Sequence, residues 1–338
     1  MKVLFNCHVP FMLAHGGAQI QIEQTKAALE KLGVKVEPLR WWDETQSGDV
    51  LHHFARIPTH LRHLAQNKGM KIVMSAFMSG LGARPPWKRF LQRLVLRAAR
   101  PVAPRPIRDL FGWDSYRLLD AIIAMTPYEA SLLTQIHNAP PSRVHVIPNG
   151  VEEVFLNSQP APRGKWLVCT ATIVELKGVL ELAQMAVQAQ TPLWVIGQPY
   201  SETDDYARRF LEYARQNHEL VRYEGAIANR ERLARIYREA RGFVLLSKRE
   251  SLSLSALEAA ACQCPLLLSD LPWARTAFKD KATYCRQTNR WQPPWSCCGA
   301  FTKPPQPWSP RRGRCPGLRS AGKSRWSMNP LLKDASRR

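Results

Sequence analysis

Short apolar segments alternate with amphipathic segments over residues 1–285, and this alternation restricts the possible folds more than any other feature. Apolar runs typical of β-strands occupy residues 2–5, 34–39, 50–54, 71–75, 121–125, 144–147, 166–170, 193–196, 221–223, 242–246 and 265–268. Apolar residues at helical spacing lie between many of them, at 18–32, 127–136, 180–188, 205–216, 230–239 and 254–261. Strands that alternate with helices form parallel sheets covered by helices, so the sequence predicts an α/β protein.

A break divides these segments into two series. The turn sequence Pro-Asn-Gly at 148–150 ends the first series, and the Pro-rich stretch 159–164 precedes the second. We therefore predict two doubly wound domains, residues 1–155 and residues 156–285. Because such sheets bind ligands beyond the carboxyl ends of their strands, we expect the site in the cleft between the domains.

Residues 286–338 differ in composition from the rest of the chain. They hold 12 basic residues and one acidic residue, and so carry +11 of the formal net charge of +21. They contain eight Pro, four Trp and three Cys but no Val, Ile, Glu, His or Tyr. Such a segment supplies neither strands nor an apolar helix face, yet disordered tails are usually poor in Trp and Cys. We interpret it as an aberrant basic tail, either disordered or a frameshift product.

The sequence disfavours several classes of protein. No run of 18 apolar residues predicts a transmembrane helix, and the apolar start of the chain is too short for a signal peptide. The five cysteines before the tail lack Cys-x-x-Cys spacing, which indicates reduced cytosolic thiols and no zinc site. We expect a cytoplasmic protein.

The net charge raises nucleic-acid binding as an alternative, but no RNA- or DNA-binding motif accompanies the basic residues, so we expect no nucleic-acid partner.

Residues 87–108 form a second basic segment. The basic residues are Lys88, Arg89, Arg93, Arg97, Arg100, Arg105 and Arg108, with apolar residues between them. Four of the arginines, at 89, 93, 97 and 100, fall on one helical face. This pattern predicts a basic amphipathic helix that contacts an anionic membrane surface, on the inner face of the membrane. The alternative is an ordinary solvated helix face.

The most specific motif covers residues 250–270. Glu250 follows a strand, whereas Glu258 lies within the next helix, whose first residues include Leu254 and Ser255. A carboxylate on a helix that faces a cleft can accept hydrogen bonds from two hydroxyl groups, as in a ribose. The amino terminus of the same helix favours a diphosphate. The alternative is two solvated glutamates near a helix end.

This stretch resembles the Glu-x7-Glu motif of the family 4 (group 1) retaining glycosyltransferases, including the Pro-x-x-x-Ser-Asp that follows at residues 265–270. The resemblance implies the GT-B fold, in which two Rossmann-like domains face each other. It also implies a nucleotide-diphosphate sugar as donor substrate and no further cofactor. In such an enzyme Glu258 would bind the ribose, and Glu250 would contact hydroxyl groups of the donor sugar.

Other segments of the second domain agree with the resemblance. Lys177, in the sequence Glu-Leu-Lys-Gly, matches a lysine that contacts the donor diphosphate, where a cation stabilises the leaving group. Gly197 matches a turn near the nucleotide, and residues 147–151 resemble the turn between the domains. Thr172 departs from the pattern, because the family usually has an arginine there. Of the arginine and lysine that the family uses to hold the donor diphosphate, only the lysine is present. The sequence therefore does not decide whether this chain binds the donor tightly or is active.

The first domain carries the weaker part of the pattern. Gly16 and Gly17 begin the first helix, where glycine permits close approach of a diphosphate sugar. We expect His15, His52 or His53 to line the cleft; the alternative is that they are structural histidines.

The resemblance implies one reaction. We expect a retaining transfer of a sugar to a glycan or lipid-linked acceptor, in cell-envelope or exopolysaccharide biosynthesis. The chain has no Asp-x-Asp motif, whose two carboxylates would indicate a metal-bound nucleotide sugar, so we expect the transfer to be metal-independent. The catalytic residues would be Lys177 and Glu250. The donor would be bound by Gly16, Gly17, Gly197, Leu254, Ser255 and Glu258. The alternatives are a catalytically impaired or truncated relative and, less favoured, a nucleic-acid-binding protein.

Overall fold

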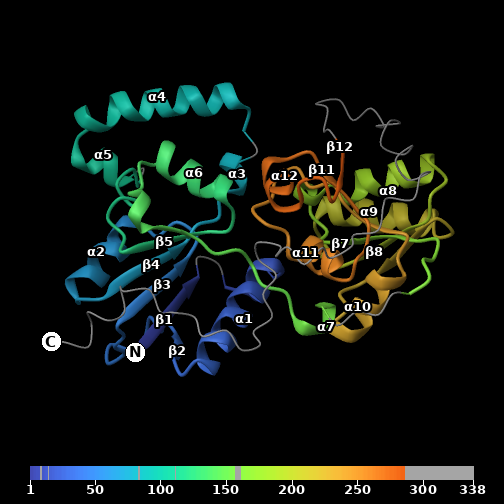
Figure 1. The fold of residues 1–338 in the computed structure, drawn as a ribbon, viewed down its shortest axis with the longest axis horizontal. Coiled ribbons are helices and arrows are strands. Elements are labelled where there is room, and N and C mark those ends of the chain that lie inside the picture. Colours follow the sequence, from blue (N-terminus) through green and yellow to red (C-terminus); the bar gives the residue numbers. More distant parts are fainter. Residues whose placement is uncertain (8–9, 14, 83, 111, 157–160, 286–338) are drawn as a thin grey trace.

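The computed structural model describes residues 1–7, 10–13, 15–82, 84–110, 112–156 and 161–285. Within these residues two six-stranded parallel sheets, each flanked by helices, form two domains side by side (Figure 1). This arrangement confirms the predicted α/β class with two Rossmann-like domains. The expectation for residues 286–338 lies outside the described residues.

The first sheet has the strand order β2-β1-β3-β4-β5-β6. Its strands are β1 (Lys2–Cys7), β2 (Lys35–Pro38), β3 (Val50–Phe54), β4 (Lys71–Ser75), β5 (Ala121–Ala124) and β6 (Val144–Val146). The helices of this domain are α1 (Gly17–Lys31), α2 (Thr59–Asn67), α3 (Ser79–Gly82), α4 (Pro86–Val102), α5 (Arg105–Leu110) and α6 (Pro127–Gln135), with the 3-10 turn η1 (Pro141–Arg143). The strand side chains Leu51, Ile72, Met74 and Ile122 are fully buried and form the centre of its core.

The second sheet has the strand order β12-β11-β10-β7-β8-β9. Its strands are β7 (Leu167–Thr170), β8 (Leu193–Ile196), β9 (Val221–Glu224), β10 (Gly242–Leu245), β11 (Leu266–Ser269) and β12 (Thr283–Cys285). The helices are α7 (Glu153–Leu156), α8 (Val179–Gln188), α9 (Asp205–Gln216), α10 (Arg230–Glu239), α11 (Leu254–Ala261) and α12 (Pro272–Phe278), with the 3-10 turn η2 (Glu175–Lys177). Cys169, Cys262 and Cys264 are free thiols in its core, where burial raises the pKa of each to about 12.

The segment that follows the first sheet, residues 147–156, is called the connector, and it packs on the second domain. Phe155 is fully buried against Tyr237, and Val151 and Val154 lie beside the same core. The amide of Asn149 donates to the backbone oxygen of Leu252 at 3.3 Å. The predicted boundary falls after residue 155, whereas the connector is already anchored on the second domain from about Val151.

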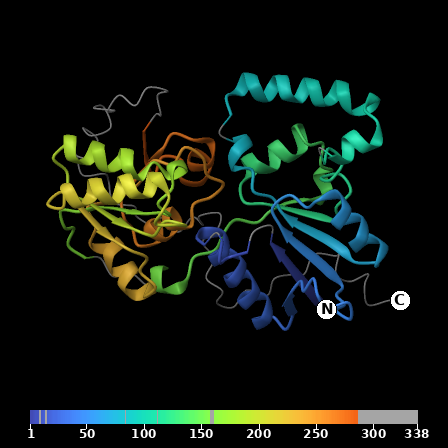
Figure 2. The same cartoon turned by 180° about the vertical axis from the view of Figure 1, so that it is seen from behind.

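The longest helix of the first domain, α4, lies along its outer side above α5 and α6 (Figures 1 and 2). It covers most of the segment for which the sequence predicted a basic helix, and the chain breaks into a separate helix, α5, after Ala103 and Pro104. None of the described helices is long and apolar enough to cross a bilayer.

Candidate functional site

The loop between β1 and α1 meets the second domain at two glycines. Gly16 has φ 131°, and a Cβ on it would lie 3.2 Å from Oγ1 of Thr172. A Cβ on Gly17 would lie 3.8 Å from Cδ1 of Leu254. The structure therefore brings together, across the domain boundary, four residues that the sequence analysis singled out separately.

The amino terminus of α11 lies opposite Gly17. Ser253 caps this helix, because its Oγ accepts a hydrogen bond from the backbone N–H of Ala256 at 3.3 Å. The hydroxyl groups of Ser253 and Ser255 are 3.1 Å apart. A helix amino terminus carries a partial positive charge, so this end of α11 presents a surface suited to an anion beside the β1–α1 loop.

Lys177 and Glu250 are brought together although 73 residues separate them in the sequence. Lys177 ends the turn η2, and Gly178 follows with a left-handed φ of 65° that redirects the chain into α8. The Nζ of Lys177 donates a hydrogen bond to Oε1 of Glu250, which also accepts one from Oγ of Ser247 at 3.1 Å. Both side chains remain partly accessible, so the pair can exchange this contact for a polar ligand.

Glu258 lies deeper than Glu250. The residue is only 5% exposed, and its Oε1 accepts a hydrogen bond from Nη2 of Arg230. Burial raises the pKa of Glu258 above its ordinary value, although the neighbouring Arg230 acts in the opposite direction. Sequence reasoning missed Arg230, because 28 residues separate it from Glu258 and no motif joins them.

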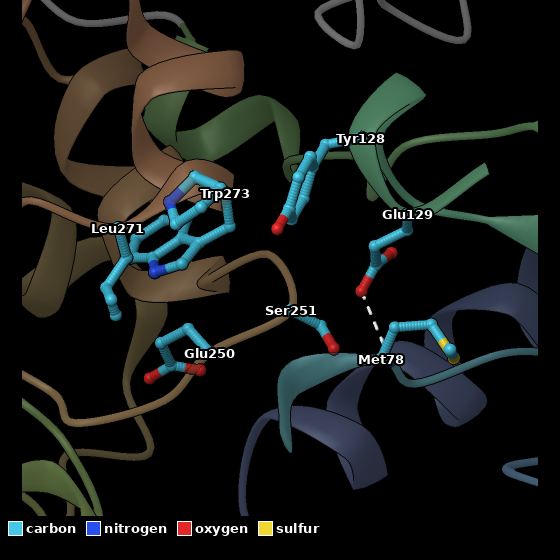
Figure 3. A pocket seen from close by; sticks show the side chains of 8 residues that line it. Met78, Tyr128, Glu129, Glu250, Ser251, Leu271 and Trp273 are labelled. Carbon is cyan, nitrogen blue, oxygen red and sulfur yellow. Dashed lines mark hydrogen bonds between the residues drawn. The ribbon is translucent and has the colours of Figure 1, made fainter. Parts of the chain in front are cut away.

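A small cavity lies between the domains at Glu250. The first domain contributes Met78, Tyr128 and Glu129, whereas the second contributes Glu250, Ser251, Leu271, Pro272 and Trp273. The space available to the centre of a water-sized sphere is about 10 Å³, enough for about one water molecule. Figure 3 shows the carboxyl groups of Glu129 and Glu250 on opposite sides, with Ser251 between them.

Glu129 is a second residue that the sequence analysis missed. Its buried carboxyl accepts hydrogen bonds from the backbone N–H groups of Met125 at 3.0 Å and Met78 at 3.2 Å (Figure 3). Burial raises its pKa. The spacing of Thr126 and Glu129, a capping-box pattern at the start of α6, is the signal that could have identified it.

His15 lies at the boundary between the domains. Gly197 lies at the end of a strand. The ring of His15 makes an edge contact with Tyr200, with ring centres 5.1 Å apart. Gly197 has φ 144°, and a Cβ there would lie 2.0 Å from the backbone oxygen of Ala171. Only glycine therefore fits at this turn beyond β8.

His52 and His53 are packing residues of β3, which corrects the expectation that one of them lines the cleft. They are 6% and 1% exposed. His52 stacks on Phe54 and contacts the hydroxyl of Ser75 at 2.8 Å, and burial lowers its pKa to about 3. His53 contacts the amide of Asn6 at 3.0 Å.

The orientation of α4 corrects the expectation of an exposed basic face. Arg89 donates to the backbone oxygen of Arg84 and to the hydroxyl of Tyr128, and Arg100 donates to the backbone oxygen of Trp113 at 2.7 Å. The exposed side of α4 carries large apolar side chains instead: Trp87, Phe90, Leu91, Leu94, Val95 and Val102. Trp87 and Phe90 are 63% and 62% exposed. Three of the four arginines of the predicted face are thus only partly exposed, and Arg89 and Arg100 contact the rest of the domain, whereas Arg97 is exposed.

The described residues contain no group of three or more His, Cys, Asp or Glu side chains placed to hold a metal ion. Lys177 and the amino terminus of α11 supply positive charge near Glu250 and Gly17, respectively.

Comparisons with known proteins identify the family. Residues 38–154 match the family model described as Glycosyltransferase Family 4, and residues 164–289 match the one described as Glycosyl transferases group 1. A D-inositol 3-phosphate glycosyltransferase from Jonesia denitrificans is 31% identical over 208 residues, which cover 53% of this chain and 48% of that protein. The chain thus spans about half the length of this relative. It belongs to the family 4 (group 1) glycosyltransferases.

Solved structures support the same fold. HepE of Anabaena, determined with UDP and glucose, is 14% identical with a TM-score of 0.62, and the match covers 90% of each chain. Sucrose-phosphate synthase from Thermosynechococcus elongatus is 17% identical with a TM-score of 0.64, over 89% of this chain and 88% of that one. The two facing domains are those of the GT-B fold.

Proposed function

We propose that this chain transfers a sugar, with retention of configuration, from a nucleotide-diphosphate sugar to a glycan or lipid-linked acceptor. The observation that carries the proposal is the Lys177–Glu250 pair, because Glu250 also lines the cavity between the two domains. The complex of HepE with UDP and glucose supports a nucleotide-sugar donor. The amino terminus of α11 would favour the diphosphate of such a donor.

Each residue has a role that its position allows. Lys177 would stabilise the charge that develops on the leaving diphosphate. Glu250 would accept hydrogen bonds from hydroxyl groups of the sugar, and Glu258 from those of the ribose. Gly16 and Gly17 would let the diphosphate approach the backbone. Because Lys177 and the helix amides supply the positive charge, the proposed reaction uses no metal ion.

The apolar face of α4 supports a proposed position on the inner surface of a membrane. Trp87, Phe90 and Leu94 are exposed on one long helix, with Lys88 and Arg97 also facing solvent. An exposed apolar patch flanked by cations suits the interface of an anionic bilayer. A cytoplasmic enzyme held there would reach lipid-linked acceptors in cell-envelope or exopolysaccharide biosynthesis.

Vesicle flotation tests this position. The wild-type chain should float with vesicles of phosphatidylglycerol and phosphatidylcholine, and Phe90→Ser with Leu94→Ser should abolish flotation. Leu64→Ser, at an exposed apolar residue of α2, is the matched control and should float like the wild type. Equal flotation of all variants would contradict a role for α4.

A panel of nucleotide-diphosphate sugars tests the function. At least one donor should raise the thermal midpoint and be turned over, and the anomeric configuration of the product, read by NMR, should match that of the donor. Binding without turnover would favour the impaired relative, in which Thr172 replaces the usual arginine at the diphosphate. An inverted product would contradict retention, and donor turnover that requires a divalent cation would contradict the metal-free reaction.

A further inference from the structure

Arg230 joins two carboxylates that come from different parts of the chain. It is the first residue of α10, and its Nη2 donates to Oε1 of Glu258 on α11. Its Nε donates to Oε1 of Glu152, in the connector between the domains, at 2.9 Å. The guanidinium also lies 4.8 Å from the centre of the Phe155 ring. One partly buried cation therefore links α11 to the connector.

This cation opposes the effect of burial on Glu258. Burial favours the protonated form and raises the pKa of Glu258, and the charge of Glu152 acts in the same direction. Arg230 and the hydroxyl of Tyr237, both on α10, lower it. The thiol of Cys262 also lies near this carboxyl. Because an ionised carboxylate accepts hydrogen bonds on both oxygens, Arg230 favours the form of Glu258 that can receive hydroxyl groups.

The connector also contacts the other end of the Glu-x7-Glu segment. Asn149 donates to the backbone oxygen of Leu252 at 3.3 Å, two residues after Glu250. Glu152 reaches Glu258 through Arg230 at the far end. The helices α7, α10 and α11 pack together in this region (Figure 1). The segment between the two domains thus contacts the motif at two points, at the backbone of Leu252 directly and at Glu258 through Arg230.

We propose that Arg230 is a positioning residue of the nucleotide site, which holds Glu258 as an oriented carboxylate for a ribose diol and couples that site to the connector through Glu152. This inference rests on the proposed function, because it takes the ligand to be a nucleotide diphosphate. It assigns to Arg230 the discrimination between ribose and deoxyribose. Glu152 acts on the same site without touching the ligand.

Calorimetric titration of the full chain with UDP and with 2′-deoxy-UDP tests this role. The wild type should bind UDP more tightly. Arg230→Gln should weaken UDP binding about tenfold or more and bring the two affinities close together, since a hydrogen bond to a charged partner is lost. Arg230→Lys should restore part of the preference, and Glu152→Gln should weaken UDP binding by a smaller factor.

Arg232→Gln is the matched control. Arg232 lies in the same helix but pairs with Glu224, so its loss should leave both affinities within about twofold of the wild type. Unchanged UDP affinity and unchanged discrimination in Arg230→Gln would overturn the proposal. So would an equal effect of Arg232→Gln, because it would show that any lost charge on α10 suffices.

A measurement without nucleotide separates this inference from the proposed function. In Arg230→Gln the buried Glu258 should bind its proton more tightly than the unfolded chain does, so the thermal midpoint should fall further at pH 8 than at pH 6. Arg230→Gln with Glu258→Gln should remove this pH dependence. If the pH-dependent loss appears but the wild type binds neither nucleotide, the nucleotide site is refuted while the Arg230–Glu258 coupling stands. Equal losses at both pH values would refute the coupling itself.

Discussion

Gly16 of the first domain lies against Thr172 of the second, so closely that a Cβ on the glycine would be 3.2 Å from the threonine hydroxyl. This contact places Gly16, the residue before α1, beside the segment that follows β7. The β1–α1 loop also faces the amino terminus of α11 through Gly17 and Leu254. The spacing between the domains at the donor site therefore depends on the absence of a side chain at Gly16.

Gly16→Ala should reduce donor turnover more than tenfold. The backbone of Gly16 has φ 131° and ψ −151°, a region open almost only to glycine, so alanine there costs about 1–3 kcal/mol of strain or shifts the loop. Gly33→Ala is the control, because Gly33 also has a positive φ, 79°, but meets no atom within 4 Å. Steady-state kinetics and thermal unfolding would compare them. Equal turnover of the two variants would argue against a role for this contact.

Thr172→Arg should strengthen donor binding. A guanidinium at this position would face the cleft beside Gly16, and a hydrogen bond between charged groups contributes about 1.5–3 kcal/mol, so the donor KM should fall about tenfold. The effect should weaken at high salt. Thr172→Val tests whether the charge is responsible, and its KM should stay within about twofold of the wild type. A Thr172→Arg enzyme with an unchanged KM would contradict the placement of the diphosphate.

Acid should destabilise the first domain through His52. Its pKa is about 3 in the fold, below the ordinary 6.5, so the unfolded chain binds the proton more readily. Stability should therefore fall as the pH drops from about 6.5 toward 3, by up to about 1.4 kcal/mol per pH unit. His52→Gln should flatten this dependence in urea unfolding at pH 7 and pH 5. His60→Gln, at an exposed histidine of α2, should retain the wild-type slope.

The alternating pattern predicted most strands and helices because it is local. The helices α2, α3, α7 and α12 and the strand β12 were missed. With seven and three residues, α12 and β12 are too short to show a period. Periodicity also predicted the arginine face of α4 but not its direction. Which face turns inward depends on partners such as Tyr128 and Trp113, distant in sequence.

Some residues of the site could likewise be predicted from the sequence, whereas others could not. Lys177 and Glu250 could be paired in advance only through the resemblance to a family, because 73 residues separate them. Arg230 had no such motif, and its role depends on the packing of α10 against α11 and the connector. For His52 and His53 the sequence placed the residues at a strand end, but their burial was decided by the neighbouring strands β1 and β4.

The central claim is that Lys177 and Glu250 act on a nucleotide-diphosphate sugar, and the release of nucleotide diphosphate during sugar transfer measures it most directly. The wild type should turn over at least one donor, and Lys177→Ala and Glu250→Gln should each lower kcat by about 10²- to 10³-fold. Lys248→Ala is the control, because Lys248 pairs with the exposed Glu175 nearby, and it should retain most of the activity. Wild-type turnover by both Lys177→Ala and Glu250→Gln would contradict the account.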